Sequence, residues 1–536
     1  MKAGVWRLVG AEAMRALDRH TIETLGVPGE LLMESAGRAV AEAVLAERAG
    51  GARPGPVLVV CGVGNNGGDG FVAARHMALL GVPVRVALVG DARKLRGDAA
   101  ANWKRLERLG VAREPARFRT AGVAIVVDAL FGTGLDRKIE GAAAAAIRRI
   151  AAARPPACVV AVDLPSGLDA DTGMAHGSAV EADVTVTLGL PKLGLALEPG
   201  RSLAGRILVA RIGIADALPS DEERRVGPAA GAELWTAAGA ARCLPARPAA
   251  GHKGSFGHVL VVAGSRGKAG AAALAAEGAA RAGAGLVTIA CPAGINEILQ
   301  VKRTETMTAP VADTAEGGLS AGSLTAILAL ARERDVVALG PGLGREAETQ
   351  KLVRDLAARV TAPLVIDADG LFGLAGESAA LKARKAATIL TPHPGEAARL
   401  LATTPAAINA DRVGAARRLA EKTASIVVLK GAGTVISGPD GRVAVNPTGG
   451  PVLGSGGTGD VLTGIVAALL AQGLAPFEAA ALAAWLHGWA GDRLAARRGR
   501  SGVLAGELAA ELPEAVEALR HIGTGGEAVG LALPFP

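Results

Sequence analysis

Short apolar runs alternate with Ala- and Leu-rich helical patterns along most of the chain, and no other feature limits the possible folds as strongly. The first half contains VLVVC (57–61), VRVALVG (84–90), AIVVDAL (124–130), CVVAVDL (158–164), VTVTLGL (184–190) and ILVARIGI (207–214). The second half contains HVLVVAG (258–264), GLVTIAC (285–291), DVVALG (335–340), PLVIDAD (363–369), ATILTPH (387–393) and SIVVLKG (425–431). Because strands separated by helices pair mostly in parallel and need helices on their faces, the sequence predicts an α/β protein.

The segment 215–231, ADALPSDEERRVGPAAG, interrupts the alternation. It is charged, contains Pro and Gly, and shows no hydrophobic period, which is typical of a linker. We therefore expect an N-terminal domain at residues 1–218, a linker at 219–236 and a C-terminal domain at 237–525. Each half is long enough to bury its own core, since domains commonly have about 100–200 residues.

The composition argues against several kinds of partner. The formal net charge is +7, but Lys and Arg are scattered among acids and aromatic residues are rare, so we expect no nucleic-acid partner. The N-terminus lacks the apolar region of a signal peptide. The longest apolar stretch, 461–489, is interrupted by Gln472, Pro476 and Glu478, which indicates buried helices and no membrane span.

The cysteines indicate a reducing compartment. None of the four belongs to a CxxC motif or a Cys/His cluster: Cys61, Cys158, Cys243 and Cys291. We expect buried free thiols in a cytoplasmic protein. Parallel α/β enzymes of this composition often assemble, so we also expect a homo-oligomer.

The segment 449–464, GGPVLGSGGTGDVLTG, places the carboxylate of Asp460 among small residues before an apolar helical pattern. Glycines at a helix start let backbone N–H groups point at an anion, and the helix dipole favours negative charge there. An ionised acid in this position could accept a proton from a hydroxyl group while the amides hold a phosphate. The segment indicates ATP- or ADP-linked chemistry on a hydroxyl, although an N-capping Asp in a glycine-rich turn has the same pattern.

Polar residues also follow strands of the first half. The loop GVGNNGGDG (62–70) formally satisfies the GxGxxG pattern, and Asp91 lies where a dehydrogenase would bind a ribose, so a Rossmann dehydrogenase must be considered. The side chains of Asn65, Asn66 and Asp69, however, make this loop too polar for a simple pyrophosphate turn.

Two further strands of the first half end in carboxylates. Asp128 and Asp163 lie at these ends, and Ser166 follows the second. Each alone could be a helix cap or a turn residue. The ends of parallel strands share one edge of a sheet, however, so a ligand site explains all three better. Asn66, Asp128 and Ser166 together supply the oxygen ligands that an alkali or alkaline-earth ion prefers.

The motifs GNNGGDG, DALFGTGL and VDLPSGLDADTG, in this order, resemble the NAD(P)H-hydrate epimerase domain, also called the YjeF N-terminal domain. The resemblance implies a Rossmann-like three-layer αβα fold and epimerisation at C6 of NADHX or NADPHX, the hydrated nicotinamide cofactors. It implies that Asn66, Asp128 and Ser166 bind K⁺ and that Asp163 transfers the proton. The implied substrate contacts are Asn65, Asn66, Gly67, Gly68, Asp69, Gly132, Thr133, Gly134, Leu135, Asp136, Arg137, Lys138 and Asp163.

Five motifs of the second half resemble the ADP/ATP-dependent NAD(P)H-hydrate dehydratase domain, which has a ribokinase-like fold. They are SRGKAGAA (265–272), GPGLG (340–344), TPHPGE (391–396), KGAGT (430–434) and GSGGTGD (454–460). The resemblance implies that ADP or ATP, with Mg²⁺, phosphorylates the C6 hydroxyl and that Asp460 is the general base. Implied nucleotide contacts are Lys430, Gly431, Ala432, Gly433, Thr434 and Gly459, and implied contacts to the hydrate are Ala271, Gly342, His393 and Asp460.

Taken together, the two resemblances predict a bifunctional enzyme that epimerises R- and S-NAD(P)HX and dehydrates the S form. The residues alone leave His393 open as a surface turn residue and Lys430 as an ordinary strand-end lysine, while His487 is expected to be a core residue. One alternative is a ribokinase-like small-molecule kinase fused to a Rossmann-like cofactor-binding domain. Another is that the first half is a non-catalytic cofactor-binding or RNA-associated module.

Overall fold

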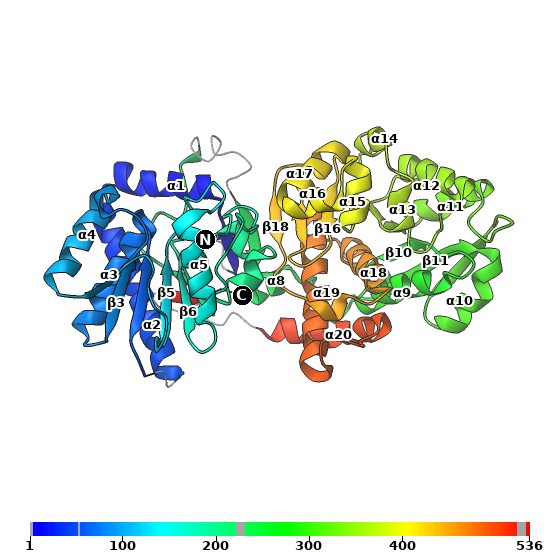
Figure 1. Cartoon of the computed structure of the whole chain (residues 1–536). Coiled ribbons are helices and arrows are strands. Elements are labelled where there is room, and N and C mark those ends of the chain that lie inside the picture. The colour runs from blue at the N-terminus through cyan, green and yellow to red at the C-terminus, as the bar shows by residue number, and fades with distance from the viewer. Residues whose placement is uncertain (1–3, 52–53, 221–230, 523–531, 536) are drawn as a thin grey trace. The chain divides into compact units, whose positions relative to one another are not determined.

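The computed structural model describes residues 4–51, 54–220, 231–522 and 532–535. The chain forms two compact units (Figure 1). The first comprises Trp6–Ala232 together with the C-terminal strand, and the second is Glu233–Gly525. Most of the expected linker 219–236 lies outside the described residues, but its last part forms a strand, Ala232–Trp235.

The first unit contains an eight-stranded sheet in the order β19-β8-β7-β6-β5-β2-β3-β4. All neighbouring strands pair in parallel except β19, which is antiparallel to β8. The strands are β2 (Val57–Cys61), β3 (Val84–Leu88), β4 (Ala112–Glu114), β5 (Ile125–Ala129), β6 (Cys158–Val162), β7 (Val184–Leu188), β8 (Arg206–Ala210) and β19 (Ala532–Pro534). Each apolar run expected in the first half forms a strand, and the parallel sheet is confirmed.

Helices cover both faces of this sheet (Figure 1). They are α1 (Ala11–Arg19), α2 (Gly29–Gly50), α3 (Asn65–Leu79), α4 (Gly97–Arg108), α5 (Gly141–Ala153) and α6 (Gly200–Leu203), with short turns η1 (His20–Thr24), η2 (Ala92–Lys94) and η3 (Leu193–Leu195). Alternate residues of β2 enter separate cores: Val59 packs with Phe71 of α3, whereas Val60 packs with Ile147 of α5. The unit is therefore the expected three-layer αβα sandwich.

The polar stretch from Asn65 to Asp69 was expected to be a loop, and this prediction was wrong, because α3 begins at Asn65. Glycine allows this early start. A Cβ built on Gly67 would lie 2.0 Å from the carbonyl oxygen of Gly62, and one on Gly70 would lie 2.6 Å from Cβ of Ala129. The first turn of α3 thus lies directly against the strand ends, where no larger residue would fit.

An eleven-stranded sheet forms most of the second unit, in the order β1-β9-β18-β17-β16-β15-β14-β13-β10-β11-β12, although residues 6–8 of β1 are counted with the first unit. Its strands are β1 (Val5–Leu8), β9 (Ala232–Trp235), β10 (His258–Val262), β11 (Leu286–Pro292), β12 (Met307–Val311), β13 (Val336–Leu339), β14 (Leu364–Ile366), β15 (Thr388–Leu390), β16 (Ile426–Leu429), β17 (Val435–Ser437) and β18 (Val443–Val445). The six runs expected in this half all form strands, and the strands from β16 to β12 pair in parallel. Only β17 is antiparallel to both of its neighbours.

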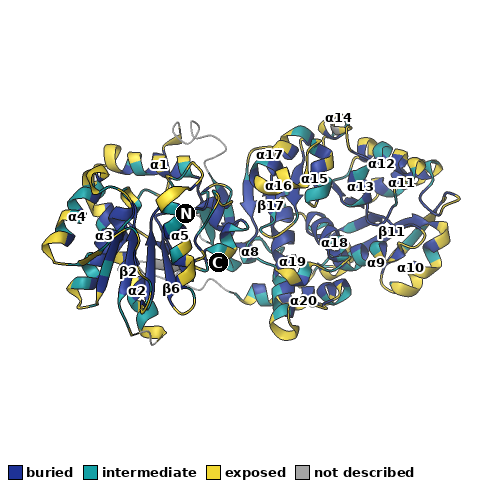
Figure 2. Cartoon of the chain, viewed as in Figure 1, coloured by how far each residue is buried: buried dark blue, intermediate teal, exposed yellow. Residues whose placement is uncertain are grey.

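The helices of the second unit are α8 (Ala237–Cys243), α9 (Ala269–Arg281), α10 (Asn296–Lys302), α11 (Leu324–Arg332), α12 (Ala347–Arg359), α13 (Asp369–Phe372), α14 (Ser378–Lys382), α15 (Pro394–Leu401), α16 (Pro405–Ala410), α17 (Arg412–Thr423), α18 (Thr458–Ala471), α19 (Pro476–Arg498) and α20 (Ala505–His521). Short turns are η5 (Lys253–Phe256), η6 (Ala293–Ile295), η7 (Ala321–Ser323) and η8 (Pro451–Leu453). Figure 2 shows the strands and α18 as the most buried elements of this unit.

Two glycines bring α18 unusually close to α9. A Cβ on Gly464 would lie 2.1 Å from the carbonyl oxygen of Ala275, and one on Gly278 would lie 2.4 Å from that of Val461. Backbone therefore packs on backbone, which fixes the start of α18 relative to the start of α9.

The long apolar stretch 461–489 becomes parts of α18 and α19, as expected. Within the described ranges, no helix is both long and apolar enough to cross a membrane. The four cysteines are all free thiols, and three of them are buried: Cys61, Cys158 and Cys291.

Candidate functional sites at two sheet edges

In the first unit, neighbouring strands β5 and β6 deliver Asp128 and Ser166 to one place. The Ser166 hydroxyl donates to Oδ1 of Asp128 at 2.7 Å, and the Ser166 N–H donates to Oδ2 at 2.8 Å. Both side chains are fully buried. Burial raises the pKa of Asp128 to about 6, although the hydrogen bonds from Ser166 oppose this rise.

Asn66, in the first turn of α3, is the third residue predicted to bind a cation. Its Nδ2 atom is buried and has no hydrogen-bond partner among the described residues. No Lys, Arg or His in the described part of the chain forms an ion pair with Asp128. The carboxylate of Asp128, the hydroxyl of Ser166 and the amide oxygen of Asn66 are the kinds of oxygen ligand that an alkali ion takes.

Asp163 follows β6 in a conformation that is rare outside glycine, with φ of +67°. Its Oδ1 atom accepts hydrogen bonds from Lys192 Nζ and from the Leu188 N–H. The Lys192 side chain is only 1% exposed, and its ammonium also donates to the carbonyl oxygen of Leu188 at 2.6 Å. A strained backbone and a buried ion pair both mark functional positions.

Two further carboxylates, those of Asp69 and Asp18, lie close enough to Lys192 to interact with its positive charge. Burial, reinforced by the charge of Asp163, raises the pKa of Asp69 well above its usual range. Burial also raises the pKa of Asp18, on α1, against the opposing charge of Lys192. Sequence reasoning missed Asp18 and Lys192. The only signal for Lys192 was its place after the strand in VTVTLGLPK, because nothing in the sequence relates it to Asp163.

The other residues predicted to contact the hydrated cofactor divide into buried and exposed groups. Gly67, Gly68 and Asp69 are buried in the first turn of α3, whereas Asn65 is exposed. The segment 132–138 after β5 is largely open to solvent; its predicted contacts are Gly132, Thr133, Gly134, Leu135, Asp136, Arg137 and Lys138. Asp91, considered as a ribose ligand, instead accepts from the Arg93 side chain at the start of η2.

In the second unit, Asp460 lies in the first turn of α18. We expected the helix dipole to keep its carboxylate ionised, and this prediction was wrong. Burial, followed by the charge of Asp367, raises the pKa of Asp460 to about 7 against the opposing charge of Lys430. At neutral pH, Asp460 is therefore poised between its acidic and basic forms.

An ion pair between partly exposed Lys430 and buried Asp367 lies beside Asp460. Lys430 Nζ donates to Oδ1 of Asp367 at 2.6 Å, and the Thr463 hydroxyl donates to Oδ2 at 2.7 Å. Burial alone would lower the pKa of Lys430, but the charges of Asp367 and its neighbours raise it. A Cβ on Gly459 would lie 3.5 Å from Lys430 Nζ. Lys430 and Gly459, both predicted nucleotide contacts, are thus brought together with Asp460.

Asp367 and Asp369 were quoted only as the end of a strand, and sequence reasoning assigned them no role. Asp369 accepts from the Gly344 N–H at 2.9 Å and from Lys268 Nζ at 3.1 Å. Between the two acids, Ala368 has φ of +50°, which is strained for a residue with a side chain. The alternation of acids in VIDADG was the signal that could have identified them.

The remaining predicted contacts of the hydrate border the same edge. A Cβ on Gly342, which has φ of +65°, would lie 2.9 Å from Cβ of Ala271. His393 caps α15, accepting the Gly395 N–H through Nδ1 at 3.0 Å. Burial, followed by the nearby Lys430, lowers the pKa of His393. Burial also raises the pKa of Glu396 to about 7.

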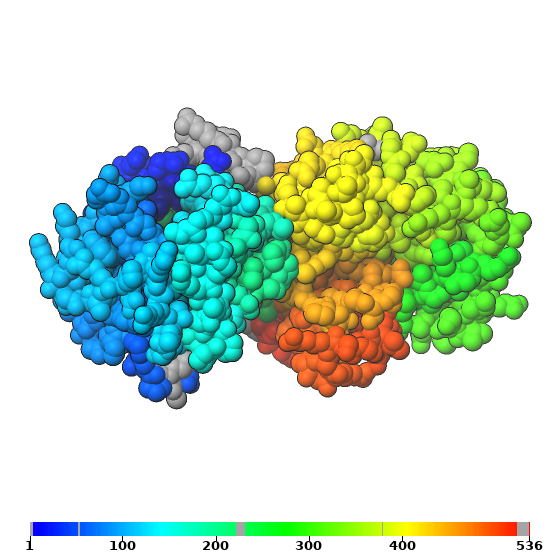
Figure 3. All heavy atoms as spheres, viewed as in Figure 1, coloured from blue at the N-terminus to red at the C-terminus, as the bar shows by residue number. Residues whose placement is uncertain are grey.

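The predicted nucleotide contacts in KGAGT follow β16. Gly431 and Ala432 are exposed, and Gly433 and Thr434 are partly exposed. Their backbone is therefore open to a ligand at the edge where Asp460 lies. In Figure 3, the second unit is hollowed where its yellow and orange segments meet.

His487 occupies the core of α19, as expected. It is buried and its Nε2 atom lies 2.9 Å from the carbonyl oxygen of Thr458, the first residue of α18. Burial lowers the pKa of His487 to about 4, so the neutral ring donates to this carbonyl at neutral pH.

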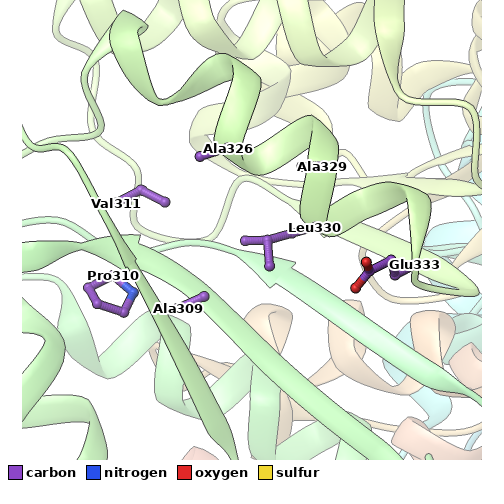
Figure 4. A pocket seen from close by; sticks show the side chains of 7 residues that line it. All are labelled: Ala309, Pro310, Val311, Ala326, Ala329, Leu330 and Glu333. Atoms are coloured by element: carbon purple, nitrogen blue, oxygen red, sulfur yellow. The ribbon is translucent and has the colours of Figure 1, made fainter.

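A cavity of about 410 Å³ between β12 and α11 shares no residue with either site (Figure 4). Its lining is apolar apart from Glu333. One carboxylate at the rim of an apolar hollow offers neither an acid–base pair nor a phosphate site.

Comparison with known proteins identifies both halves. A family model described as YjeF-related protein N-terminus matches residues 29–194, and one described as NAD(P)H-hydrate dehydratase matches residues 259–514. The bifunctional NAD(P)H-hydrate repair enzyme of Moorella thermoacetica is 46% identical over 94% of this chain and 96% of its own length. That of Thermofilum pendens is 42% identical over 95% of this chain and 96% of its own length.

Among solved structures, the ADP/ATP-dependent NAD(P)H-hydrate dehydratase of Bacillus subtilis, co-crystallised with ATP and Mg²⁺, is 30% identical with a TM-score of 0.46. It covers 53% of this chain and 98% of its own length. Both matched regions have the α/β architecture that the sequence predicted, with helices packed on a mostly parallel sheet. On its full-length similarity to these enzymes, the chain belongs to the family of bifunctional NAD(P)H-hydrate repair enzymes.

Proposed function

We propose that the first unit interconverts R- and S-NAD(P)HX at Asp163 and that the second dehydrates S-NAD(P)HX at Asp460, at the expense of ADP or ATP. The observation that carries the proposal is that each unit holds an aspartate–lysine ion pair at one sheet edge, Asp163 with Lys192 in the first unit and Asp367 with Lys430, beside Asp460, in the second. Membership of the family supplies the substrate class.

C6 of the hydrated nicotinamide carries both a hydroxyl group and the ring nitrogen N1. Epimerisation therefore requires one of these bonds to break and to form again on the other face. When Asp163 accepts the hydroxyl proton and returns it to N1, the C6–N1 bond breaks and C6 becomes an aldehyde carbon. Rotation and the reverse proton transfers then close the ring with the opposite configuration, with no net change in protons.

Potassium is the proposed ion at Asn66, Asp128 and Ser166. The buried Asp128 carboxylate and the Ser166 hydroxyl bonded to it support an oxygen-rich site. A bound cation would neutralise Asp128 and fix the end of β5 close to the substrate. We expect epimerisation to proceed faster in K⁺ than in Na⁺ at equal ionic strength, measured as consumption of R-NADHX. Equal epimerisation rates with all alkali ions would contradict a K⁺-selective site at these residues.

In the second unit, the proposed reaction is phosphorylation of the C6 hydroxyl followed by loss of phosphate. Asp460 accepts the hydroxyl proton, and the C6 oxygen takes the terminal phosphoryl group while AMP or ADP leaves. The C6–O bond then breaks with release of phosphate, a proton leaves C5, and the C5=C6 double bond of NAD(P)H forms. Backbone amides of 431–434 and of the α18 start would hold the nucleotide phosphates. Mg²⁺ supplies charge neutralisation of those phosphates when bound.

The cellular setting is also part of the proposal. Four free cysteines, three of them buried, support a cytoplasmic protein. A homo-oligomer is supported by large apolar side chains that the second unit exposes at Ile298, Val301 and Met307. Light scattering that gives the mass of one chain would contradict the oligomer.

The decisive experiment follows absorbance at 340 nm after the protein is mixed with R- and S-NADHX, Mg²⁺, K⁺ and either ADP or ATP. Recovery of NADH from the whole mixture is expected, and the faster nucleotide identifies the phosphoryl donor. Conversion of only the S-NADHX fraction to NADH would contradict the proposed epimerase activity. A stable phosphorylated product without NADH would instead indicate a small-molecule kinase.

A further inference from the structure

The two oxygens of Asp163 have different surroundings. Oδ1 accepts from Lys192 Nζ, from the Leu188 N–H at 3.2 Å and from the Thr187 hydroxyl at 3.5 Å. No hydrogen bond from the described residues reaches Oδ2. The carboxylate is therefore held by one oxygen, and the other is left to meet a ligand.

Lys192 is fixed in the position from which it holds Asp163. Its side chain is 1% exposed, and its ammonium donates to Asp163, to the carbonyl oxygen of Leu188 and to the Thr187 hydroxyl. An ammonium has three protons, so all of its donors are used. It therefore has no proton left for a substrate, and its effect must pass through Asp163.

Oδ2 faces a space that exists because residue 132 is glycine. A Cβ built on Gly132 would lie 2.9 Å from Oδ2 of Asp163 and 3.0 Å from Oδ1 of Asn66. Any side chain at this position would stand directly before both oxygens. Gly132 has no left-handed φ, so its backbone conformation is open to alanine. Among the described residues, these two oxygens are the nearest atoms that a side chain at position 132 would meet.

We propose that Lys192 is the positioning residue of the epimerase, which directs Oδ2 of Asp163 toward the substrate, and that Gly132 keeps the approach to Oδ2 open. The inference rests on the proposed function of the first unit. Oδ2 is then the atom that accepts the C6 hydroxyl proton and returns it to N1, while Oδ1 stays bound to Lys192 throughout. C6 lies against the backbone of Gly132, between Asp163 and Asn66.

The test uses the full-length protein and two variants of Lys192. Lys192→Met keeps the length of the side chain and removes all three donors, whereas Lys192→Arg keeps charge and donors. We expect Lys192→Met to lower kcat for epimerisation of R-NADHX by about a hundredfold with little change in KM, because substrate still binds while the proton acceptor is misdirected. Lys192→Arg should regain part of the loss. Lys94→Met, at an exposed lysine of the same unit, is the matched control.

The approach to Oδ2 is tested with Gly132→Ala. This variant should raise KM for R-NADHX or abolish epimerisation, whereas Gly50→Ala, at an open helix end in the same unit, should leave both constants unchanged. Urea unfolding of each variant shows whether the first unit still folds. If Lys192→Met does not fold, Lys192→Arg still tests the role of Lys192, and Gly132→Ala still tests the approach to Oδ2.

The second unit provides an internal reference in each variant. Dehydration of S-NADHX should keep its wild-type rate, because none of these residues belongs to that unit. A wild-type protein that leaves R-NADHX untouched would refute the epimerase itself. A wild type that epimerises, together with a Lys192→Met or Gly132→Ala variant of equal kcat and KM, would refute the roles of Lys192 and Gly132 alone.

Discussion

Lysine–aspartate pairs lie at both sites, but they serve different acids. Lys192 binds Asp163, the proposed base of the first unit, directly. Lys430 binds Asp367, and the proposed base Asp460 lies beside that pair. The first base thus gains an attached cation, whereas the second gains mainly burial and a neighbouring negative charge.

At the residue scale, Asp460→Asn should lower the rate of dehydration by about a hundredfold, since amide nitrogen and oxygen cannot serve as the general base. Binding of ADP or ATP should change little, because the predicted phosphate contacts are backbone amides. Single-turnover kinetics with S-NADHX and a separate nucleotide titration measure the two effects. Near wild-type turnover in this variant would exclude Asp460 from the mechanism.

The pH dependence of dehydration follows from the pKa of Asp460, which burial raises to about 7. The base acts only when ionised, so kcat/KM should rise with pH through 7 and fall about tenfold per unit well below it. Rates measured from pH 5 to 8 in the wild type and in Asp460→Asn check this. A wild-type profile that is flat between pH 6 and 8 would contradict the assignment.

His487 should make the stability of the second unit depend on pH. Its pKa is lowered by burial to about 4, below the ordinary value of 6.5, so the folded state favours the neutral ring. Its contribution is present above pH 6.5 and is lost as pH falls toward 4. His487→Phe should be destabilised by about 1–3 kcal/mol at pH 7, because Thr458 loses its partner. Urea unfolding should show that the wild type exceeds His487→Phe in free energy of unfolding by less at pH 5 than at pH 7. An equal difference at the two pH values would contradict this role of His487.

At the scale of elements, the packing of α9 against α18 positions the start of α18 and with it Asp460. In Gly464→Ala, the added methyl carbon would lie 2.1 Å from the carbonyl oxygen of Ala275. We expect a loss of about 2–3 kcal/mol in the free energy of unfolding and reduced dehydration. Gly506→Ala, in α20 with open space around it, is the control and should be neutral or slightly stabilising. Equal stability of the two variants in urea would show that the helices can separate without cost.

Sequence patterns predicted the long parallel strands well, because each is a continuous apolar run such as VLVVC. They missed shorter strands of three to five residues, in which too few apolar residues stand in a row to be recognised: β1, β4, β9, β12, β17, β18 and β19. The loop predicted at Asn65–Asp69 is a helix because glycines let it pack against strand ends, a tertiary effect. Lys192 was missed for the same reason, because its role depends on a contact with Asp163, which is distant in sequence, and not on the residues next to it in the chain.

At the scale of the whole molecule, the C-terminal strand belongs to the first unit. β19 pairs with β8 in the register Leu533↔Val209, and Phe535 is buried and lies near Trp6, with ring centroids 6.1 Å apart. Phe535→Ala should lower the stability of the first unit by about 3 kcal/mol. Heat inactivation should then affect epimerisation and spare dehydration. Loss of both activities together, or of neither, would contradict this.

The same strand has a consequence for synthesis on the ribosome. β8 ends at Ala210, and its antiparallel neighbour β19 begins at Ala532. At a translation rate of about 5–20 residues per second, β8 is therefore synthesised tens of seconds before the strand that pairs with its free edge. During that interval each nascent chain carries a bare strand edge, the kind of surface on which chains aggregate. A chain that stops before Ala532 would keep this strand edge uncovered after synthesis, so the fold of the first unit depends on residues translated after the whole second unit.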